Sequence, residues 1–458
     1  MLFCFCTMQT VAQQKHFEQI IGWRGNDIEL HTISDKTKQQ SCTFVVHRGS
    51  IEAFVFNNEV KVIQQFNIPL KATEKVLGGF IRDSKAYLFT EQLGRDRLHN
   101  WVLDITTGNI KDYFVKFDLK KEKAVDHLSG GGRFLYFTSK SKTSEFIIYD
   151  FTSEQQIDTL RYQFEESAWN DLTTGAFSRI ASLEKIDLEG DCSINKAVRG
   201  NKLYPRNDTL FLVMNNHRDS TLVFSFDLEH KNVNNWVIKH HTGSSVPLNG
   251  DYSDNSFLLR NKLYYLLATS DSLCIQVVDL YTGVINRSYV ASKEDEISFK
   301  NTPIMQDGGT YSNGASRELG KTKQLLRKMV NGDVVITASL NDNNQVEVVV
   351  GSFARMTSQL NGGRVRPEGG PGSPMVVAPA GGFYRNTRIK SAGFKTLLNA
   401  STFEHIDGNI GNTINEKIEY YTGGIKIPPQ AENLFMTNGR YYYAYYDKTL
   451  RKLVILKL

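Results

Sequence analysis

Residues 85–110 read KAYLFTEQLGRDRLHNWVLDITTGNI, with two short apolar runs, YLFT at 87–90 and NWVL at 100–103, on either side of a polar turn. Both runs are rich in aromatic, aliphatic or β-branched residues and are too short for a helix. The second run ends in Asp104-Ile105-Thr106-Thr107-Gly108. An Asp side chain can accept hydrogen bonds from amides two residues on, and Gly accepts a positive φ. The stretch therefore predicts a small antiparallel meander.

Units of this kind recur along the chain. Further paired apolar runs lie at 43–66, 123–165, 209–227, 263–279, 333–350 and 434–458. Four units carry an equivalent aspartate, at Asp104, Asp150, Asp227 and Asp279. The step from Asp104 to Asp150 is 46 positions, which matches a propeller blade of ~40 to 50 residues. We therefore predict an all-β fold, a β-propeller of seven blades, each a four-stranded antiparallel sheet, with six or eight blades left open.

The two ends of the chain predict how the ring closes. The last apolar run, 453–458, ends the chain inside a strand, and a strand-like run, DIELHTIS, occupies 27–34. We expect the 27–34 strand to complete the last blade, because a ring of sheets needs a latch between its ends. Residues 15–458 then form a single propeller domain. Within it, 175–186 fits a short helix or a strand, and 292–320 is expected to be an extended loop.

The first 14 residues, MLFCFCTMQTVAQQ, predict a truncated signal peptide, because a short apolar run precedes small residues near a cleavage-like site. A buried N-terminal strand is the alternative. We expect an exported protein, periplasmic or associated with the outer membrane. No apolar run approaches the ~18 to 20 residues that span a membrane. The net charge of +5, with no long Lys/Arg run, argues against nucleic-acid binding.

The turns at Asp104 and Asp279 resemble those of the quinoprotein-like and YVTN-like propeller superfamily. The chain lacks the regular tryptophan motifs of quinoprotein enzymes, with four Trp in all, and lacks the signatures of WD repeats. The resemblance thus implies the fold and no catalytic residue. The leader and the Asn, Lys and Tyr-rich strands resemble exported envelope proteins of the Bacteroidota. Such propellers serve as scaffolds, sugar-associated proteins and accessory subunits of outer-membrane machines, which leaves several functions open.

A Gly/Pro-rich insertion at 357–389 is the most informative local feature, since long loops in compact domains are often functional. Arg and aromatic residues concentrate at interface hot spots. The candidate partner-binding residues are Arg364, Arg366, Met375, Val376, Phe383, Tyr384, Arg385 and Arg388. A disordered loop without a partner and a substrate lid are the alternatives.

Other polar groupings are weaker. The run 341–344 with Glu347 could offer oxygen ligands to calcium, but its spacing favours a hairpin turn. His240 and His241 would face opposite sides of a strand, so we expect surface histidines. The four repeated aspartates suggest turn caps rather than a carboxylate ring. Cys42, Cys192 and Cys274, which follow the leader, are expected as free thiols. We predict no metal, no cofactor and no catalytic residue.

Three function classes follow. The first is a non-catalytic interaction protein, an accessory subunit that docks on an outer-membrane or periplasmic partner through its rim and the 357–389 loop. The second is a carbohydrate- or peptide-processing enzyme with acids in the central funnel. The third is a sugar-binding module that uses the same funnel. We favour the first, because the chain shows interface composition and no catalytic motif.

Overall fold

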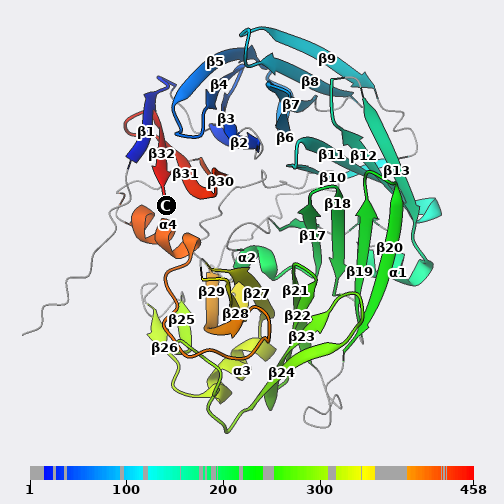
Figure 1. Ribbon diagram of the computed structural model, residues 1–458, viewed down its shortest axis with the longest axis vertical. Coiled ribbons are helices and arrows are strands. Elements are labelled where there is room, and N and C mark those ends of the chain that lie inside the picture. The colour runs from blue at the N-terminus through cyan, green and yellow to red at the C-terminus, as the bar shows by residue number, and fades with distance from the viewer. Residues whose placement is uncertain are drawn as a thin grey trace, which may run out of the picture.

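The computed structural model describes most of the chain from Lys15 to Leu458. The stretches outside the described residues are 1–14, 24–26, 36–38, 93–96, 117–121, 155, 175–178, 181–182, 187–191, 193, 216–219, 241–251, 308–315, 342, 356–388, 424, 426–428 and 430. Within the described ranges, seven sheets of four or five strands follow one another around a ring (Figure 1). The predicted seven-bladed, all-β propeller is confirmed.

The first three blades follow the expected order, with the inner strand first. They are β2 (Glu29–Asp35), β3 (Gln40–His47), β4 (Ser50–Phe56) and β5 (Val62–Pro69); β6 (Glu74–Arg82), β7 (Lys85–Gln92), β8 (Arg97–Asp104) and β9 (Ile110–Lys116); and β10 (Lys123–Gly130), β11 (Arg133–Lys140), β12 (Glu145–Phe151) and β13 (Ile157–Gln163). All pairings within these blades are antiparallel.

The remaining blades keep the meander with additions. The fourth is β17 (Asn201–Arg206), β18 (Thr209–Met214), β19 (Ser220–Asp227) and β20 (Asn232–Lys239); the fifth is β21 (Ser253–Leu259), β22 (Lys262–Ala268), β23 (Ser272–Asp279) and β24 (Ile285–Ser292). The sixth holds β25 (Met305–Asp307), β26 (Arg317–Glu318), β27 (Asp333–Leu340), β28 (Gln345–Arg355) and β29 (Ile389–Asn399). The seventh holds β30 (Glu432–Thr437), β31 (Arg440–Asp447), β32 (Lys452–Lys457) and β1 (Lys15–Ile20).

Short helices lie between these sheets. They are α1 (Glu166–Leu172), α2 (Ile194–Ala197), α3 (Thr322–Val330) and α4 (Ile414–Gly423), with a 3₁₀ turn at Ser141–Thr143. β14 (Thr173–Thr174) pairs with β15 (Arg179–Ile180). β15 and β16 (Glu184–Lys185) lie within 175–186, so the strand alternative holds for the described residues there. None of the helices in the described ranges has the length and apolar character that crossing a bilayer requires.

The hydrophobic core lies between neighbouring blades, where facing strands interdigitate their large side chains. Phe146 of the third blade and Phe226 of the fourth are both fully buried, with ring centroids 5.9 Å apart. Tyr204 of the fourth blade meets Phe257 of the fifth edge to face at 5.6 Å. Such aromatic pairs add to the burial of apolar surface. The abundance of Phe and Tyr therefore serves to hold sheet against sheet.

The ring has two distinct faces. We call the face that carries the turns from first to second and from third to fourth strand of each blade the turn face. The opposite face, which carries the second-to-third connections and the passages between blades, is the crossover face. In blade six, the turn between β27 and β28 lies on the turn face, and the 356–388 segment leaves from the crossover face.

The ring is closed by an N-terminal strand, as predicted, but by a different one. β1 pairs antiparallel with β32, from Lys15 opposite Leu456 to Ile20 opposite Lys452. The 27–34 strand instead falls largely within β2, the inner strand of the first blade. The prediction failed because β1 reads KHFEQI, is mostly exposed and lacks a buried face to mark it as a strand.

Blade six also corrects the sequence-based reading. Its outer strand β25 precedes the inner strand β27 in the chain and pairs with β29, with Gln306 opposite Ala392. The expected loop over 292–320 is therefore wrong where β25 and β26 form. His405, beyond the end of β29, forms an isolated bridge with Leu398.

Two further elements, β16 and α2, lie on the side of the inner strands that faces the central axis of the ring. β16 pairs in parallel with β17, whose other edge belongs to β18, so β16 stands inside the inner strand of blade four. α2 packs against β27 of blade six and lies near the middle of the ring (Figure 1). Lys185 of β16 donates to Asp126 Oδ1 and to the carbonyl of His127, both at 2.8 Å. β16 and α2 thus link blades three, four and six on the axis side of the inner strands.

Candidate functional site

Most of the repeated aspartates cap their own turns. Asp104 Oδ1 accepts hydrogen bonds from the amides of Thr106 and Thr107 at 3.0 and 2.9 Å. Asp227 and Asp279 do the same for the amides two and three positions on. The turn-cap interpretation is confirmed for these three residues. Asp447 in blade seven shows the same geometry, although its turn was not singled out in the sequence.

Asp150 departs from this pattern. In blade three the strand continues one residue further, so that Phe151 pairs with Ile157 and Asp150 stands within the sheet opposite Asp158. Its Oδ2 instead accepts a hydrogen bond from Arg133 Nη1 at 2.7 Å. The side chain of Asp150 is 7% exposed. The predicted turn-cap role is therefore wrong here.

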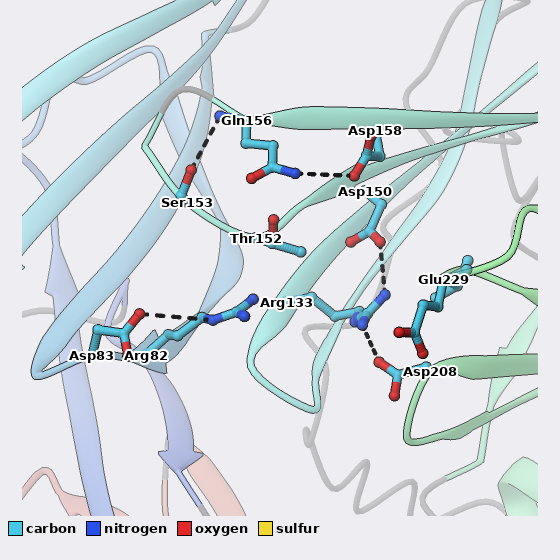
Figure 2. Close-up of a pocket in the computed structure, with 11 residues that line it drawn as sticks. Arg82, Asp83, Arg133, Asp150, Thr152, Ser153, Gln156, Asp158, Asp208 and Glu229 are labelled. Carbon is cyan, nitrogen blue, oxygen red and sulfur yellow. Dashed lines mark hydrogen bonds and ion pairs between the residues drawn. The ribbon is translucent and has the colours of Figure 1, made fainter.

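A polar pocket of about 470 Å³ on the turn face includes Asp150 in its lining. Three blades build it (Figure 2). The β6–β7 turn supplies Arg82 and Asp83, and the β17–β18 turn supplies Asp208. The third blade supplies Arg133 and Asp150 at its centre, with Thr152, Ser153, Gln156 and Asp158 beside them. Leu228 and Glu229 of blade four complete the lining.

Arg133 organises the pocket. Its guanidinium donates from Nη1 to Asp150 and from Nη2 to Asp208, so one cation joins a buried carboxylate to an exposed one on the next blade. Burial raises the pKa of Asp150 to about 6, against the lowering effect of the Arg133 charge, and the nearby Asp158 adds to the rise. A hydrogen bond from Lys231 at 2.9 Å holds the pKa of Asp158 below its usual value.

A second buried polar group lies between blades four and five. Lys202 of β17 is fully buried, and its Nζ donates to Asn255 Oδ1 and to the carbonyl of Ser256, both at 2.9 Å. Both acceptors are neutral. Burial therefore lowers the pKa of Lys202 to about 7. These two hydrogen bonds join the inner strands of the two blades.

His240 is not a surface histidine, contrary to expectation. Its side chain is 1% exposed, its Nε2 lies 3.1 Å from Thr221 Oγ1, and its ring stacks on Tyr265 with centroids 4.2 Å apart. Asp254 Oδ2 is 4.0 Å from the same nitrogen. His241 lies outside the described residues. The polar residues flanking β20 gave no hint that this histidine turns inward.

The predicted partner-binding residues all fall in 356–388, outside the described residues. The predicted hairpin turn at 341–344 is confirmed, because Asn341 Oδ1 accepts from the amides of Asn343 and Gln345 at 3.0 and 2.9 Å. In the described part of the chain, Cys42, Cys192 and Cys274 form no disulfide, as expected. In the described part of the chain, no group of three or more His, Cys, Asp or Glu side chains is placed to hold a metal ion.

The pocket itself was not predicted. Its charged residues come from turns of three blades, and no spacing in the sequence brings Arg82, Arg133 and Asp208 together. Asp150 lacks the Thr-Gly pair that follows Asp104 and Asp279, but so does Asp227, which caps its turn, so the missing pair alone does not single out Asp150.

No family model and no curated protein matches this chain. Among solved structures, Kluyveromyces lactis Hsv2 with a complete loop 6CD is similar at 9% identity and a TM-score of 0.36, over 94% of this chain and 98% of that one. The apocarotenoid oxygenase of Synechocystis is similar at 7% identity and a TM-score of 0.31. The match covers 59% of this chain and 62% of the oxygenase, just under two thirds of its length. Similarities this distant leave ligand and activity open, and the propeller assignment rests on the seven sheets.

Proposed function

We propose that this protein is a non-catalytic interaction propeller, exported to the cell envelope, that docks on an envelope protein through its rim and the 357–389 insertion. The supporting observation is the base of that insertion. β28 and β29 are each 11 residues long and pair without a break from Gln345 opposite Asn399 to Arg355 opposite Ile389. The insertion therefore leaves and re-enters the blade at two directly paired positions.

At this base the last two pairs, Ala354 opposite Lys390 and Arg355 opposite Ile389, lie beyond both neighbouring strands and form a two-stranded stalk. Strands elsewhere in the ring are shorter, 8 residues in β27 for example, so the hairpin extends past its inner neighbour on the crossover face. The pairing of β28 with β29 already holds the two ends of the insertion together. The sequence between its ends can then vary without disturbing the blade, which suits a segment selected for binding. Its Arg and aromatic content is that of an interface hot spot.

The rim offers apolar surface as well. Val62 and Ile63 on β5 are 40% and 44% exposed, and Phe114 on β9 and Val237 on β20 are more than half exposed. Outer strands also present unpaired backbone groups, which partner chains can use. These features support contact through the rim.

The funnel-based alternatives receive less support. β16 and α2 place chain on the axis side of the inner strands. Asp126, an acid that faces this region, is paired with Lys185 at 2.8 Å. A glycosidase-type site needs two carboxylates with room for substrate between them. The described residues near the axis therefore fit a role in joining blades better than a glycosidase-type site.

The paired base allows a clean test. Residues 356–388 are replaced by Asn-Gly, which closes two-residue hairpins, and the tagged protein is purified from gently solubilised native envelopes. We expect an unchanged thermal unfolding midpoint and loss of the co-purified partner. In a second variant, Arg364→Ala/Arg366→Ala should weaken co-purification, while Arg48→Ala, at a site 77% exposed in the turn between β3 and β4, should not. If the Asn-Gly variant still co-purified with the partner, the proposed role of the insertion would be wrong.

Export has its own measurement. Mass spectrometry of the mature protein, after fractionation of native cells, should find a chain that lacks the first 14 residues in the envelope or periplasmic fraction. A chain that keeps Met1 and stays with cytoplasmic markers would contradict export and leave the docking proposal to be judged by co-purification alone.

A further inference from the structure

The pocket around Arg133 lies on the turn face, whereas the 357–389 insertion leaves from the crossover face. It is therefore a separate site from the docking surface proposed above. Three consecutive blades contribute to it, and its side chains converge from their turns (Figure 2). A cavity of about 470 Å³ is in the range of small-ligand sites.

The pocket has an excess of negative charge. Five carboxylates line it, from Asp83, Asp150, Asp158, Asp208 and Glu229, against the guanidinium groups of Arg82 and Arg133. With all of these groups ionised, the lining carries a formal charge of minus three. Lys231, beside the pocket, compensates one carboxylate through Asp158. Two negative charges remain.

The cations of the pocket are already engaged. Arg133 is shared between Asp150 and Asp208, and Arg82 Nε lies 3.9 Å from Asp83. Glu229, by contrast, is exposed and has no cation within ion-pair distance among the described residues. The unneutralised charge thus sits at the accessible side of the pocket, where an incoming ligand would meet it.

A buried group strengthens the negative field. Asp150 is more than nine-tenths buried, and its Oδ1 has no hydrogen-bond partner, while Arg133 Nε beside it is unpartnered as well. A buried, incompletely paired carboxylate acts through a lower effective dielectric than one in water. Burial raises the pKa of Asp150, and the negative charges of Asp158 and Asp208 raise it further. The site therefore favours an added positive charge.

From this arrangement we infer that the pocket binds a basic side chain, an arginine guanidinium or a lysine ammonium, presented by a peptide segment of a partner protein. Glu229 and Asp208 would receive the cation, and the hydroxyl and amide groups of Ser153 and Gln156 offer further hydrogen-bond partners. A planar guanidinium suits paired carboxylates best, because it donates along two parallel directions.

Other ligand classes fit less well. An anion would face the excess of carboxylates. A sugar would lack an aromatic platform, because Leu228 is the one apolar residue of the lining. A metal ion would need converging ligands, and the described residues hold no such group.

The test uses the full-length protein and a fluorescent blocked pentapeptide, GRGRG, with fluorescence anisotropy as the readout. The same peptide with citrulline in place of arginine is the neutral control. We expect saturable binding of GRGRG that weakens with added salt, and none of the citrulline peptide. Glu229→Gln should weaken binding by about threefold or more, as expected for one exposed charge pair. Glu294→Gln, an exposed acid that follows β24 on the crossover face, is the matched control and should bind as the wild type does.

Several outcomes would overturn the inference. These are no saturable binding of GRGRG, equal binding of the citrulline peptide, or equal affinity in Glu229→Gln and the wild type. Spermidine is the competitor in a further arm. Displacement of the peptide by spermidine at concentrations well below the peptide's own dissociation constant would reassign the pocket to free polyamines. The Asn-Gly variant that lacks 356–388 should keep the binding, so failure here and failure of the insertion's role can be told apart.

Discussion

The hydroxyl of Tyr446 donates a hydrogen bond to the carbonyl of Trp23 at 2.7 Å, although 423 positions separate the two residues. Tyr446 is 1% exposed and lies in β31, while Trp23 follows β1. The bond fixes the segment between β1 and β2 against the last blade. It is thus part of the closure of the ring.

Tyr446→Phe should lower the free energy of unfolding by about 1 kcal/mol, because the carbonyl of Trp23 loses its donor. The same substitution at Tyr265 is the matched control. The hydroxyl of Tyr265 is buried without a hydrogen-bond partner, so Tyr265→Phe should leave stability unchanged or raise it. Urea unfolding at pH 7.5 measures both. Equal losses would show that the Trp23 bond contributes nothing of its own.

Lys202→Met should change how stability depends on pH. The folded-state pKa of Lys202, about 7, lies below the ordinary value of 10.5. The unfolded chain therefore binds one more proton between these values, and the contribution of Lys202 to stability rises as pH rises through this window. The advantage of Lys202→Met over the wild type should shrink by about 1.4 kcal/mol per pH unit between pH 7.5 and 9.5.

Unfolding of both proteins at four pH values checks this, with the exposed Lys239→Met as the control that should show no such trend. Asp150 and Asp254, whose pKa values burial raises to about 6, titrate below this window. Parallel pH profiles for Lys202→Met and the wild type would contradict the buried, neutral amine.

Asp279→Ala should cost about 1 to 2 kcal/mol at pH 7, as the loss of a capping side chain does. Asp279 accepts from the amides of Tyr281 and Thr282 and from Lys262, whose hydrogen bond at 2.7 Å is the main cause of a pKa lowered to about 2. Because this pKa is depressed, the stability is present above about pH 4 and is lost as pH falls towards 2. Thermal unfolding at pH 7 and at pH 2.5 should show the gap between variant and wild type narrowing.

Gly79→Ala should be severely destabilising, by about 3 kcal/mol or more, because overpacking against backbone cannot relax. A Cβ on Gly79 would lie 1.8 Å from the carbonyl oxygen of Tyr87 on the neighbouring strand. The control is Gly320→Ala, where a Cβ meets nothing within 4 Å. A normal unfolding midpoint for Gly79→Ala would show that β6 and β7 are further apart than described.

Local patterns in the sequence were enough to predict the blades. The strands of the hairpins either alternate apolar and polar residues or are apolar on both faces. Turn aspartates such as Asp104 bind amides no more than three residues away, so the residues that form each turn are neighbours in the sequence. The same holds for the turn at Asn341. Such features depend on contacts between residues that are close in the chain, so a single sequence is enough to predict them.

Long-range features could not be predicted in this way. β1 is a polar strand that forms only because β32 offers it an edge. β25 joins a blade whose other strands come later in the chain. The charged pocket depends on how three blades set their turns side by side, and no spacing in the sequence shows that arrangement. The partner-binding residues of the insertion, from Arg364 to Arg388, stay a prediction.

The pairing of β1 with β32 also sets the order of folding. Each of the first five blades can form as soon as its own strands are made, but the last needs both β1 and β32, from the two ends of the ring. Closure is therefore the pairing of highest contact order and, we expect, the slow step. Until β1 pairs with β32, the free edge of β32 can pair with β1 of a second copy of the chain in the same register. Strand exchange between copies, favoured by high protein concentration during refolding, is the characteristic error that this form of closure brings.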